Sequence, residues 1–587
     1  MAPIEADLAG DDKDQQAEPQ GATKDEIEAE DDEVIYINNP LRAPVINDTK
    51  MKVTDLHEII ARKNKDEAFN TEYQNLPHGL VHPHETSKAP ENIFRNRFKT
   101  TFAYDHSRVI LRKEKEGFSD YINANEIEDT KGIKAYIATQ GPKVTTLDDF
   151  WRMVWQKQSG KIIMLANLVE LGKKKCSKYW DGEEGNSLQL GLYHVTLQEE
   201  LSYAFYTIRK LSVRNKQTNA KRQIMQYHFT KWPDHGVPEA FELLQFHKRV
   251  QSTPTDLNGP LIVHCSAGIG RTGTYIGLDA LLKEGNENDE IDVFAYTKRM
   301  RKDRMNMIQT IDQYVVLHDV LAEGLGIVTQ CMTEPDFSKN ISDMLTGGIV
   351  EKQFNASINL NKTSMQHHKM AVERYRVYLT STTSDYINAI NAPSYRDQYG
   401  YIITQHPLHN TVEDFWSMVS QQAVDVIVSI GTPQGDARWP TQEGHVDTFG
   451  DYTVMYDETQ PQTLKSDVVI KRKLSIQNKN CCNHSWNESL PSTKSMLELI
   501  QQVLTSKGSV TSPVVITCSN GSSESGLLCV LCNVMERLEV DGEVDIMAAA
   551  RQLQIRRPQC LQNMAQYEFC YKVMKDHLDN GSVYANI

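Results

Sequence analysis

A cysteine and an arginine lie six residues apart in a glycine-rich segment, and this spacing suits phosphate chemistry. The segment comprises His264, Cys265, Ser266, Ala267, Gly268, Ile269, Gly270, Arg271 and Thr272. It follows the apolar run Leu261–Val263 and precedes a second apolar stretch, so we expect a buried strand, a tight loop and a helix. The unpaired amides and the dipole of that helix would attract an anion to the loop.

This anion cradle predicts phosphoryl transfer. A cysteine at a helix N-terminus favours its thiolate form, and an arginine fork can hold two phosphate oxygens. We therefore expect Cys265 to attack phosphorus and form a phosphocysteine while Arg271 and the amides of residues 266–270 hold the phosphoryl oxygens. An ordinary strand-to-helix turn with a buried cysteine is the alternative, and the complete string disfavours it.

The complete segment resembles the active-site signature of the classical protein tyrosine phosphatases. Members of that family carry a general acid in a Trp-Pro-Asp loop, and this chain has that motif at Trp232–Asp234, followed by glycine and proline. The resemblance implies that Asp234 protonates the leaving phenolate from a hinged acid loop, Trp232–Pro238. A plain surface turn is the alternative. Gln309 and Gln313 resemble the family's glutamine loop, which orients the water that hydrolyses the phosphocysteine.

The resemblance also implies supporting roles for residues around the loop. Glu170 would pair with Arg271 and fix its fork, Thr272 would hydrogen-bond the cysteine sulfur, and His264 would support the thiolate through the loop backbone. Phe98 stands where the family's recognition loop usually has tyrosine, so it can stack on a phenyl ring but has no hydroxyl. We predict retained phosphotyrosine selectivity with weaker anchoring of the peptide.

The chain repeats itself over a long period. Asp120-Tyr-Ile-Asn-Ala recurs 265 residues later at Asp385, and Cys265 matches Cys518, 253 residues later. This indicates a tandem duplication of one large domain. We expect an acidic disordered tail over 1–50, a catalytic domain over 52–330, a degenerate phosphatase-like domain over 335–580 and a C-terminal tail over 581–587.

The second copy has lost residues that the chemistry needs. In the loop around Cys518, Glu524 stands where the first copy has arginine, and a carboxylate there repels phosphate and disfavours the thiolate. The counterpart of the acid loop has Glu488 in a Trp-Asn-Glu-Ser sequence and lacks the Pro-Asp pair. The second copy also has no counterpart of Glu170. We expect a pseudophosphatase domain that binds, positions or stabilises.

The patterning predicts an α/β fold with a mixed, twisted sheet and helices on both faces. We expect buried strands over 161–166 and 424–430, antiparallel strands over 203–208 and 222–229, and helices over 54–63, 240–251 and 273–283. The resemblance implies tandem tyrosine-phosphatase domains, each a twisted mixed sheet flanked by helices. Cys529 and Cys532 lie in an apolar run, which favours buried helix positions over a metal site.

Composition limits the compartment and the partners. The net charge of −15 is concentrated in the first 33 residues, and the remainder is near balance, so no basic face indicates nucleic acid. Ten cysteines in no framework spacing indicate a reducing compartment. The sequence shows no signal peptide and no apolar run long enough to span a bilayer. We expect a cytoplasmic form or the cytoplasmic part of a receptor, at the inner face of the plasma membrane.

The resemblance implies phosphotyrosine proteins as substrates and requires no metal or cofactor, because the arginine and the backbone amides supply the electrostatic stabilisation. The C-terminal Tyr584-Ala-Asn tail resembles an SH2-docking site when phosphorylated, and an ordinary disordered end is the alternative. Two rival functions remain. A phosphotyrosine-binding scaffold with little turnover is disfavoured by the intact Asp234, and a lipid or phosphoserine phosphatase by Phe98 and the large domain.

Overall fold

One mixed sheet organises the first half of the chain in the computed structural model. Its strands are β2 (Arg108–Ile110), β3 (Tyr121–Ile127), β4 (Tyr136–Thr139), β5 (Lys161–Met164), β8 (Ser187–Leu190), β9 (Tyr193–Ser202), β10 (Tyr206–Asn215), β11 (Lys221–Phe229) and β12 (Leu261–His264). Their order is β2-β3-β4-β12-β5-β11-β10-β9-β8, with parallel pairing from β4 through β12 and β5 to β11. The strand that leads into Cys265 therefore lies centrally.

The structure describes residues 49–114, 116–234, 236–326, 331–367, 371–380, 384–431, 446–456, 462–463, 469–476, 479–486 and 491–580, all within one compact unit. The acidic tail up to residue 48, Glu488 and Tyr584 lie outside the described residues, so the predictions made for them are untested by the structure.

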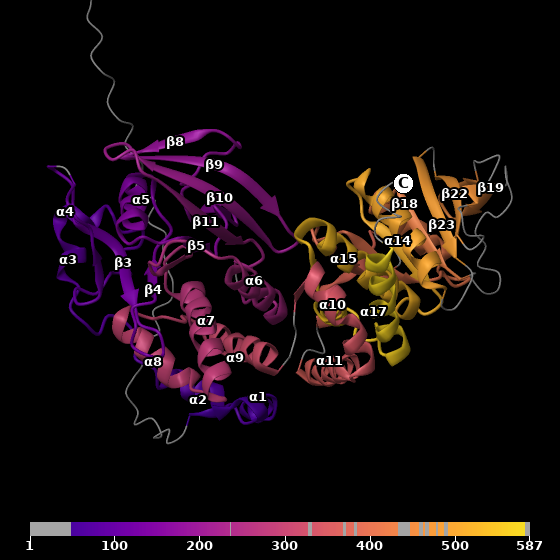
Figure 1. Cartoon of the computed structure of the whole chain (residues 1–587), viewed down its shortest axis with the longest axis horizontal. Coiled ribbons are helices and arrows are strands. Elements are labelled where there is room, and N and C mark those ends of the chain that lie inside the picture. Colours follow the sequence, from indigo (N-terminus) through magenta and orange to yellow (C-terminus); the bar gives the residue numbers. More distant parts are fainter. Residues whose placement is uncertain are drawn as a thin grey trace, which may run out of the picture. The chain divides into compact units, whose positions relative to one another are not determined.

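Helices cover both faces of the first sheet (Figure 1). They are α1 (Leu56–Lys65), α2 (Ala68–Gln74), α3 (Glu85–Lys88), α4 (Pro90–Ile93), α5 (Leu147–Gln156), α6 (Ala240–Ser252), α7 (Gly270–Asn288), α8 (Val293–Asp303) and α9 (Ile311–Gly326). Successive strand residues alternate between the two layers: Ile262 packs with Trp151 of α5, whereas Val263 packs with Leu243 of α6 and Ile276 of α7. Burial on both faces explains the continuous apolar runs of the central strands.

Two short strand pairs lie outside this sheet. β1 (Met51–Lys52) pairs with β13 (Glu290–Ile291), and β6 (Val169–Glu170) pairs with β7 (Lys173–Lys174). The β6–β7 hairpin positions Glu170. We call the part of the chain from β1 to α9 the first domain.

The second half of the chain, from β14 to α17, repeats this architecture and is called the second domain. Its strands are β14 (Met332–Thr333), β15 (Arg376–Tyr378), β16 (Tyr386–Ala392), β17 (Tyr401–Gln405), β18 (Val426–Ile430), β19 (Val446–Phe449), β20 (Tyr452–Tyr456), β21 (Gln462–Thr463), β22 (Val469–Ile476), β23 (Lys479–Trp486), β24 (Val514–Cys518) and β25 (Glu543–Val544). Its helices are α10 (Glu334–Thr346), α11 (Ile349–His367), α12 (Ala371–Arg374), α13 (Val412–Gln421), α14 (Thr493–Gly508), α15 (Ser523–Asp541), α16 (Ile546–Gln554) and α17 (Met564–Asp579).

The second sheet has the order β15-β16-β17-β24-β18-β23-β22-β20-β19, which matches the order of the first sheet, and the short strand β21 pairs with β22 in addition. The cysteine-bearing strand β24 again lies between two parallel neighbours, β17 and β18. The predicted fold class, two mixed α/β units with flanking helices, is confirmed. The predicted burial of Cys529 and Cys532 within a helix is also confirmed, because both are buried in α15.

Local boundaries differ from the sequence-based expectations by a few residues at several places. The strand expected over 203–208 is confirmed only from Tyr206, where β10 begins, because Tyr203–Phe205 form the turn between β9 and β10 and are buried together rather than alternately. Their burial has a non-local cause: Tyr203 packs edge-on against Tyr395 of the second domain. The helix expected from Gly273 begins at Gly270, and the helix expected from Thr54 begins at Leu56 after one 3-10 turn.

Candidate active site

The loop after β12 forms a cradle around the sulfur of Cys265. Cys265 directly follows β12 and has 5% of its surface exposed. The chain then turns through Gly268, whose φ of +73° is a left-handed conformation that glycine adopts without strain. The amide of Gly268 and the hydroxyl of Thr272 both donate to Sγ, at 3.3 Å each. Two donors directed at one sulfur stabilise negative charge on it.

A buried arginine stabilises the cradle through its carbonyl oxygens. Arg304, at the end of α8, is fully buried and donates to the carbonyl oxygens of Gly268 (2.7 Å) and Ala267 (3.0 Å). The same guanidinium donates to the side chains of Asn125 and Asn123 on β3. Burial lowers the pKa of Arg304 to about 10, so it stays charged at neutral pH. These bonds direct the loop carbonyls toward Arg304, away from the side where an anion would bind.

Arg271 is oriented by a bidentate ion pair. Its Nη1 and Nη2 lie 2.7 and 2.9 Å from the two carboxylate oxygens of Glu170. Nη1 also donates to the carbonyl of Leu165 at 3.1 Å, and Nη2 to the carbonyl of Pro233 at 3.2 Å. Four bonds from two nitrogens restrict the plane of the guanidinium, so it meets an incoming phosphate with little loss of side-chain entropy. The contact with Pro233 brings the acid loop to the edge of the cradle.

Asp234 lies within the reach of two cations. Its Oδ1 is 3.4 Å from Nζ of Lys175 and 3.8 Å from Nη2 of Arg271. Burial alone would raise the pKa of Asp234, but a hydrogen bond with Glu170 and the charges of Lys175 and Arg271 outweigh burial and hold the pKa below its ordinary value. The carboxyl group and the guanidinium thus face the same space from different elements.

The remaining sequence-predicted residues surround this centre. Nε2 of His264 lies 2.9 Å from the hydroxyl of Tyr179, and burial lowers the pKa of His264 to about 4, so its ring is neutral at physiological pH. Phe98 packs against a small apolar cluster that includes Ile269 of the cradle. The amide of Gln309 donates to Oε1 of Gln313 at 2.9 Å.

Gln313 also approaches the cradle from the other side. A Cβ added at Gly270 would lie 2.8 Å from Oε1 of Gln313, so the amide end of Gln313 lies close against the start of α7. The structure therefore brings together residues from six segments: the segment around Phe98, the β6–β7 hairpin, the acid loop, the cradle, the end of α8 and the segment of Gln309 and Gln313.

The corresponding loop of the second domain has a different interior. Cys518 is fully buried at the end of β24, and its Sγ lies 3.2 Å from Oγ of Ser525 and 3.4 Å from Oδ1 of Asn520. Oδ1 of Asn520 accepts the backbone amides of Ser522 and Ser523, both at 2.9 Å. A side-chain oxygen thus takes up amides that a phosphate oxygen would need.

The first domain has no such internal acceptor at the matching position, because Ala267 stands where the second domain has Asn520. Glu524 follows in the first turn of α15, at the position of Arg271, as the sequence comparison indicates. The second loop therefore combines a carboxylate in place of the phosphate clamp with amides that are already bonded.

Two residues of these sites were missed by sequence reasoning. Arg304 lies well outside the signature segment and carries no local motif, so only its long-range contacts show its role. Asn520 is part of the degenerate loop, and its signal was available as a polar side chain where the first copy has Ala267. Among the described residues, no cluster of three or more histidine, cysteine, aspartate or glutamate side chains could hold a metal ion.

Comparison with known proteins identifies the class that this fold and site define. The family model for protein-tyrosine phosphatase matches the chain twice, over residues 92–323 and 361–576. The chain belongs to the protein-tyrosine phosphatase family, with the tandem organisation of its receptor-type members.

Individual relatives support the same placement. Receptor-type tyrosine-protein phosphatase epsilon of Homo sapiens is 33% identical over 590 residues, covering 91% of this chain and 83% of the relative. Receptor-type tyrosine-protein phosphatase zeta of Rattus norvegicus is 31% identical over 598 residues, covering 92% of this chain but 26% of the relative. The chain thus spans about a quarter of the length of the zeta phosphatase. In the part of the chain that the structure describes, no helix is both long enough and apolar enough to cross a membrane.

Proposed function

We propose that the chain hydrolyses phosphotyrosine in proteins through a phosphocysteine on Cys265, with Asp234 as general acid, and that its second domain is a regulatory pseudophosphatase. The observation that carries this proposal is the juxtaposition, at the loop that begins with Cys265, of Arg271, held by Glu170, and the Asp234 carboxyl group, 3.8 Å from Arg271. A nucleophile, a phosphate clamp and an acid are the three groups that the reaction needs.

In the first step the thiolate of Cys265 attacks phosphorus, a sulfur–phosphorus bond forms and the bond from phosphorus to the tyrosine oxygen breaks. The proton of Asp234 passes to that oxygen, so tyrosine leaves as a neutral phenol. Arg271 and the amides of residues 266–270 stabilise the charge on the equatorial oxygens. Phe98 stacks beside the phenyl ring of the substrate and favours a long aromatic leaving group over phosphoserine.

In the second step water attacks the phosphocysteine. Gln309 and Gln313 orient the water, the ionised Asp234 accepts its proton, and the sulfur–phosphorus bond breaks to release phosphate and the thiolate. The Thr272 hydroxyl, 3.3 Å from Sγ, stabilises the departing sulfur. His264 supports the cradle as a neutral ring rather than as a proton acceptor.

The low pKa of Asp234 in the free protein fits this cycle. A phosphate dianion in the cradle would share the positive charges of Lys175 and Arg271, and its own charge would disfavour a second anion nearby. Substrate binding is therefore expected to raise the pKa of Asp234, so that the carboxylate takes up the proton that it later donates to the leaving group. Release of phosphate reverses the shift.

The pseudophosphatase assignment has independent support in the second loop. Glu524 replaces the phosphate clamp, and Asn520 accepts two amides that would otherwise face a phosphate oxygen. Cys518 alone does not supply binding or leaving-group protonation. We therefore assign the second domain a positioning role.

The names of the relatives describe receptor-type proteins, and on that basis we propose that this chain acts on phosphotyrosine proteins in the cytoplasm, at the inner face of the plasma membrane. The C-terminal Tyr584 remains a proposed docking site for an SH2 protein. A synthetic peptide of the tail with phosphorylated Tyr584 should retain SH2 proteins that the unphosphorylated peptide does not. Equal retention by both peptides would remove this docking site.

The decisive assay compares the full chain with its Cys265→Ser and Cys518→Ser variants on phosphotyrosine and phosphoserine peptides. We expect turnover of phosphotyrosine only, abolished by Cys265→Ser and unchanged by Cys518→Ser. Tight binding of phosphotyrosine peptides by the wild type without turnover would instead identify a scaffold. Loss of turnover in Cys518→Ser would contradict the pseudophosphatase assignment.

A further inference from the structure

We propose that the second domain positions the general acid of the first domain by holding the chain on both sides of the acid loop. The contacts fall on Lys231, one residue before the loop, and on Glu239, one residue after it. The proposal rests on Asp234 being the general acid. It makes Gln398 and Tyr375 positioning residues that act through the flanks of the loop without touching the substrate.

The upstream contact is direct. The ammonium group of Lys231 donates to Oε1 of Gln398, which lies between β16 and β17 of the second domain. Lys231 is half-buried, so the contact is partly shielded from water, and the same burial lowers the pKa of Lys231. A shielded hydrogen bond to a charged donor is stronger than an exposed one. The residue that enters the acid loop is thereby tied to the second domain.

A second upstream route runs through the turn between β9 and β10. Both the amide and the hydroxyl of Thr230 donate to the carbonyl of Phe205, each at 2.9 Å. The turn is in turn bound by the second domain, since the amide of Ala204 donates to the carbonyl of Tyr395 at 3.3 Å. This explains why Tyr203–Phe205 are buried together. The segment before the acid loop is therefore held at two successive residues.

The downstream contact falls on Glu239, the residue directly before α6. A carboxylate oxygen of Glu239 accepts the hydroxyl of Tyr375 at 3.2 Å, and Arg374 lies 3.8 Å from the same oxygen. Phe241, in the first turn of α6, is buried against Tyr375 and against Ile555 of the second domain. The end of the acid loop therefore continues directly into a helix whose first turn is packed against the other domain.

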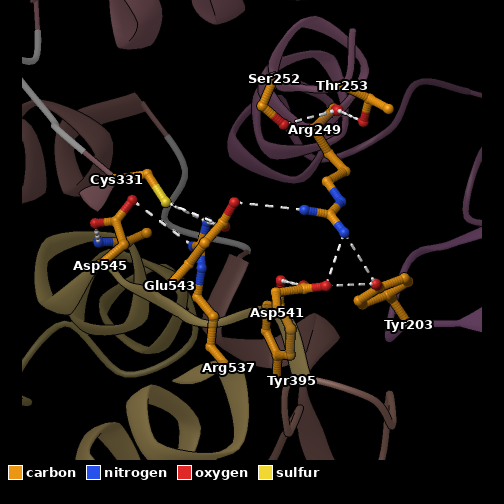
Figure 2. Close-up of polar contacts among 11 residues, drawn as sticks. Tyr203, Arg249, Ser252, Thr253, Cys331, Tyr395, Arg537, Asp541, Glu543 and Asp545 are labelled. Atoms are coloured by element: carbon orange, nitrogen blue, oxygen red, sulfur yellow. Dashed lines mark hydrogen bonds and ion pairs between the residues drawn. The ribbon is translucent and has the colours of Figure 1, made fainter. Parts of the chain in front are cut away.

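The rest of α6 is fixed in the same way. Glu242 pairs with the buried Arg556 at 2.5 Å. Figure 2 shows Arg249, near the other end of the helix, reaching toward Asp541 and Glu543, with Nη2 2.7 Å from Asp541 and Nη1 3.4 Å from Glu543. Near its start the helix contributes a carboxylate to an arginine of the second domain, and near its end it contributes an arginine to two carboxylates of that domain. α6 cannot shift along its axis without separating several of these pairs.

Short chain distances carry this restraint to Asp234. Asp234 lies three positions after Lys231 and five positions before Glu239, and each residue spans at most about 3.5 Å, so displaced flanks move the carboxyl group. A catalytic group misplaced by about 1 Å can lose roughly a hundredfold in rate. The second domain thus contributes to proton transfer without a catalytic residue of its own.

The test uses leaving groups of different acidity in the full chain. A tyrosine leaving group needs the proton of Asp234, whereas a nitrophenolate departs without it. The double variant Gln398→Ala, Tyr375→Phe should lower kcat/KM for a phosphotyrosine peptide about tenfold and for a nitrophenyl phosphate less than about twofold, because each lost hydrogen bond is modest. Gln398→Glu keeps the acceptor for Lys231 and should stay within about twofold of the wild type on both substrates.

Matched controls separate positioning from general damage. Gln562→Ala and Tyr386→Phe change exposed residues of the second domain and should leave kcat/KM unchanged for both substrates. If the double variant loses kcat/KM equally on both substrates, or loses none on either, the proposal is overturned. Asp234→Ala separates a failure of the proposed acid from a failure of the second domain's role: if this variant does not show the leaving-group dependence, the assignment of Asp234 as the acid fails. If it does and the double variant does not, only the role of the second domain fails.

Discussion

Substituting alanine for one glycine in each cradle tests the site with the second domain as an internal control. Gly268 and Gly521 occupy matching positions with φ of +73° and +66°. A Cβ at Gly268 would come closer than 3.0 Å to backbone atoms of Thr139 and Gln140, and a Cβ at Gly521 would meet backbone atoms of Thr404 and Gln405 equally closely. Neither neighbour is a flexible side-chain end, so the loop itself must move.

The expected loss of stability is similar in both domains. A left-handed conformation costs an L-residue about 1–2 kcal/mol, and overpacking against a rigid neighbour costs about 1–3 kcal/mol more. We expect a destabilisation of roughly 3 kcal/mol for either variant, which corresponds to about 6–12 °C in the unfolding temperature of a domain of this size. Gly79→Ala, with a φ of +78° and open space around its Cβ, should show the strain alone.

The effect on activity should differ sharply between the two cradles. Gly268→Ala displaces the amides that face the phosphoryl group and should lower kcat/KM for a phosphotyrosine peptide by at least about a hundredfold. Gly521→Ala should leave it within about twofold at a temperature where both variants are folded. Calorimetry and steady-state kinetics on the full chain measure both quantities. A Gly268→Ala protein with unchanged activity, or an inactive Gly521→Ala protein, would refute this reasoning.

Three further outcomes follow from individual contacts. Thr272→Ala should lower kcat about tenfold by removing a hydrogen bond to the departing sulfur, with Thr272→Ser restoring it; equal kcat in both would contradict the contact. Phe98→Tyr should raise kcat/KM for phosphopeptides, and an unchanged value would disprove weak anchoring. Burial lowers the pKa of His264 to about 4 and of His228 and His318 to about 3. Only the unfolded chain binds these protons just below pH 6.5, so the first domain should lose about 1.4 kcal/mol per pH unit for each histidine on acidification toward pH 5. Denaturant unfolding curves that stay constant over this range would contradict these shifts.

The features that could be predicted from the sequence are those formed by residues that are neighbours along the chain. The apolar run before Cys265, the glycines and the following helix are neighbours along the chain, so their local structure follows from local preferences. The repeat can likewise be recognised from the sequence, by comparing the segment around Cys265 with the segment around Cys518. Positions that depend on a distant partner could not be predicted in the same way, as Arg304 shows, because nothing near it in sequence indicates that it supports the loop carbonyls of the cradle.

The error at the β9–β10 turn has the same physical origin. Buried aromatic residues at Tyr203 and Phe205 resemble an alternating strand when only local burial is considered. Their actual partner is the second domain, more than a hundred residues away in sequence. The contacts of Lys231 and Glu239 with the second domain are equally invisible in the sequence, although the acid loop between them could be recognised.

The most direct test of the central claim is detection of the phosphorylated cysteine. The full chain should be mixed briefly with a peptide whose phosphotyrosine carries labelled phosphate, quenched in acid and digested. We predict label on the fragment that contains Cys265 and none on the fragment that contains Cys518. Hydrolysis that proceeds without label on Cys265, or with label on Cys518, would contradict the account.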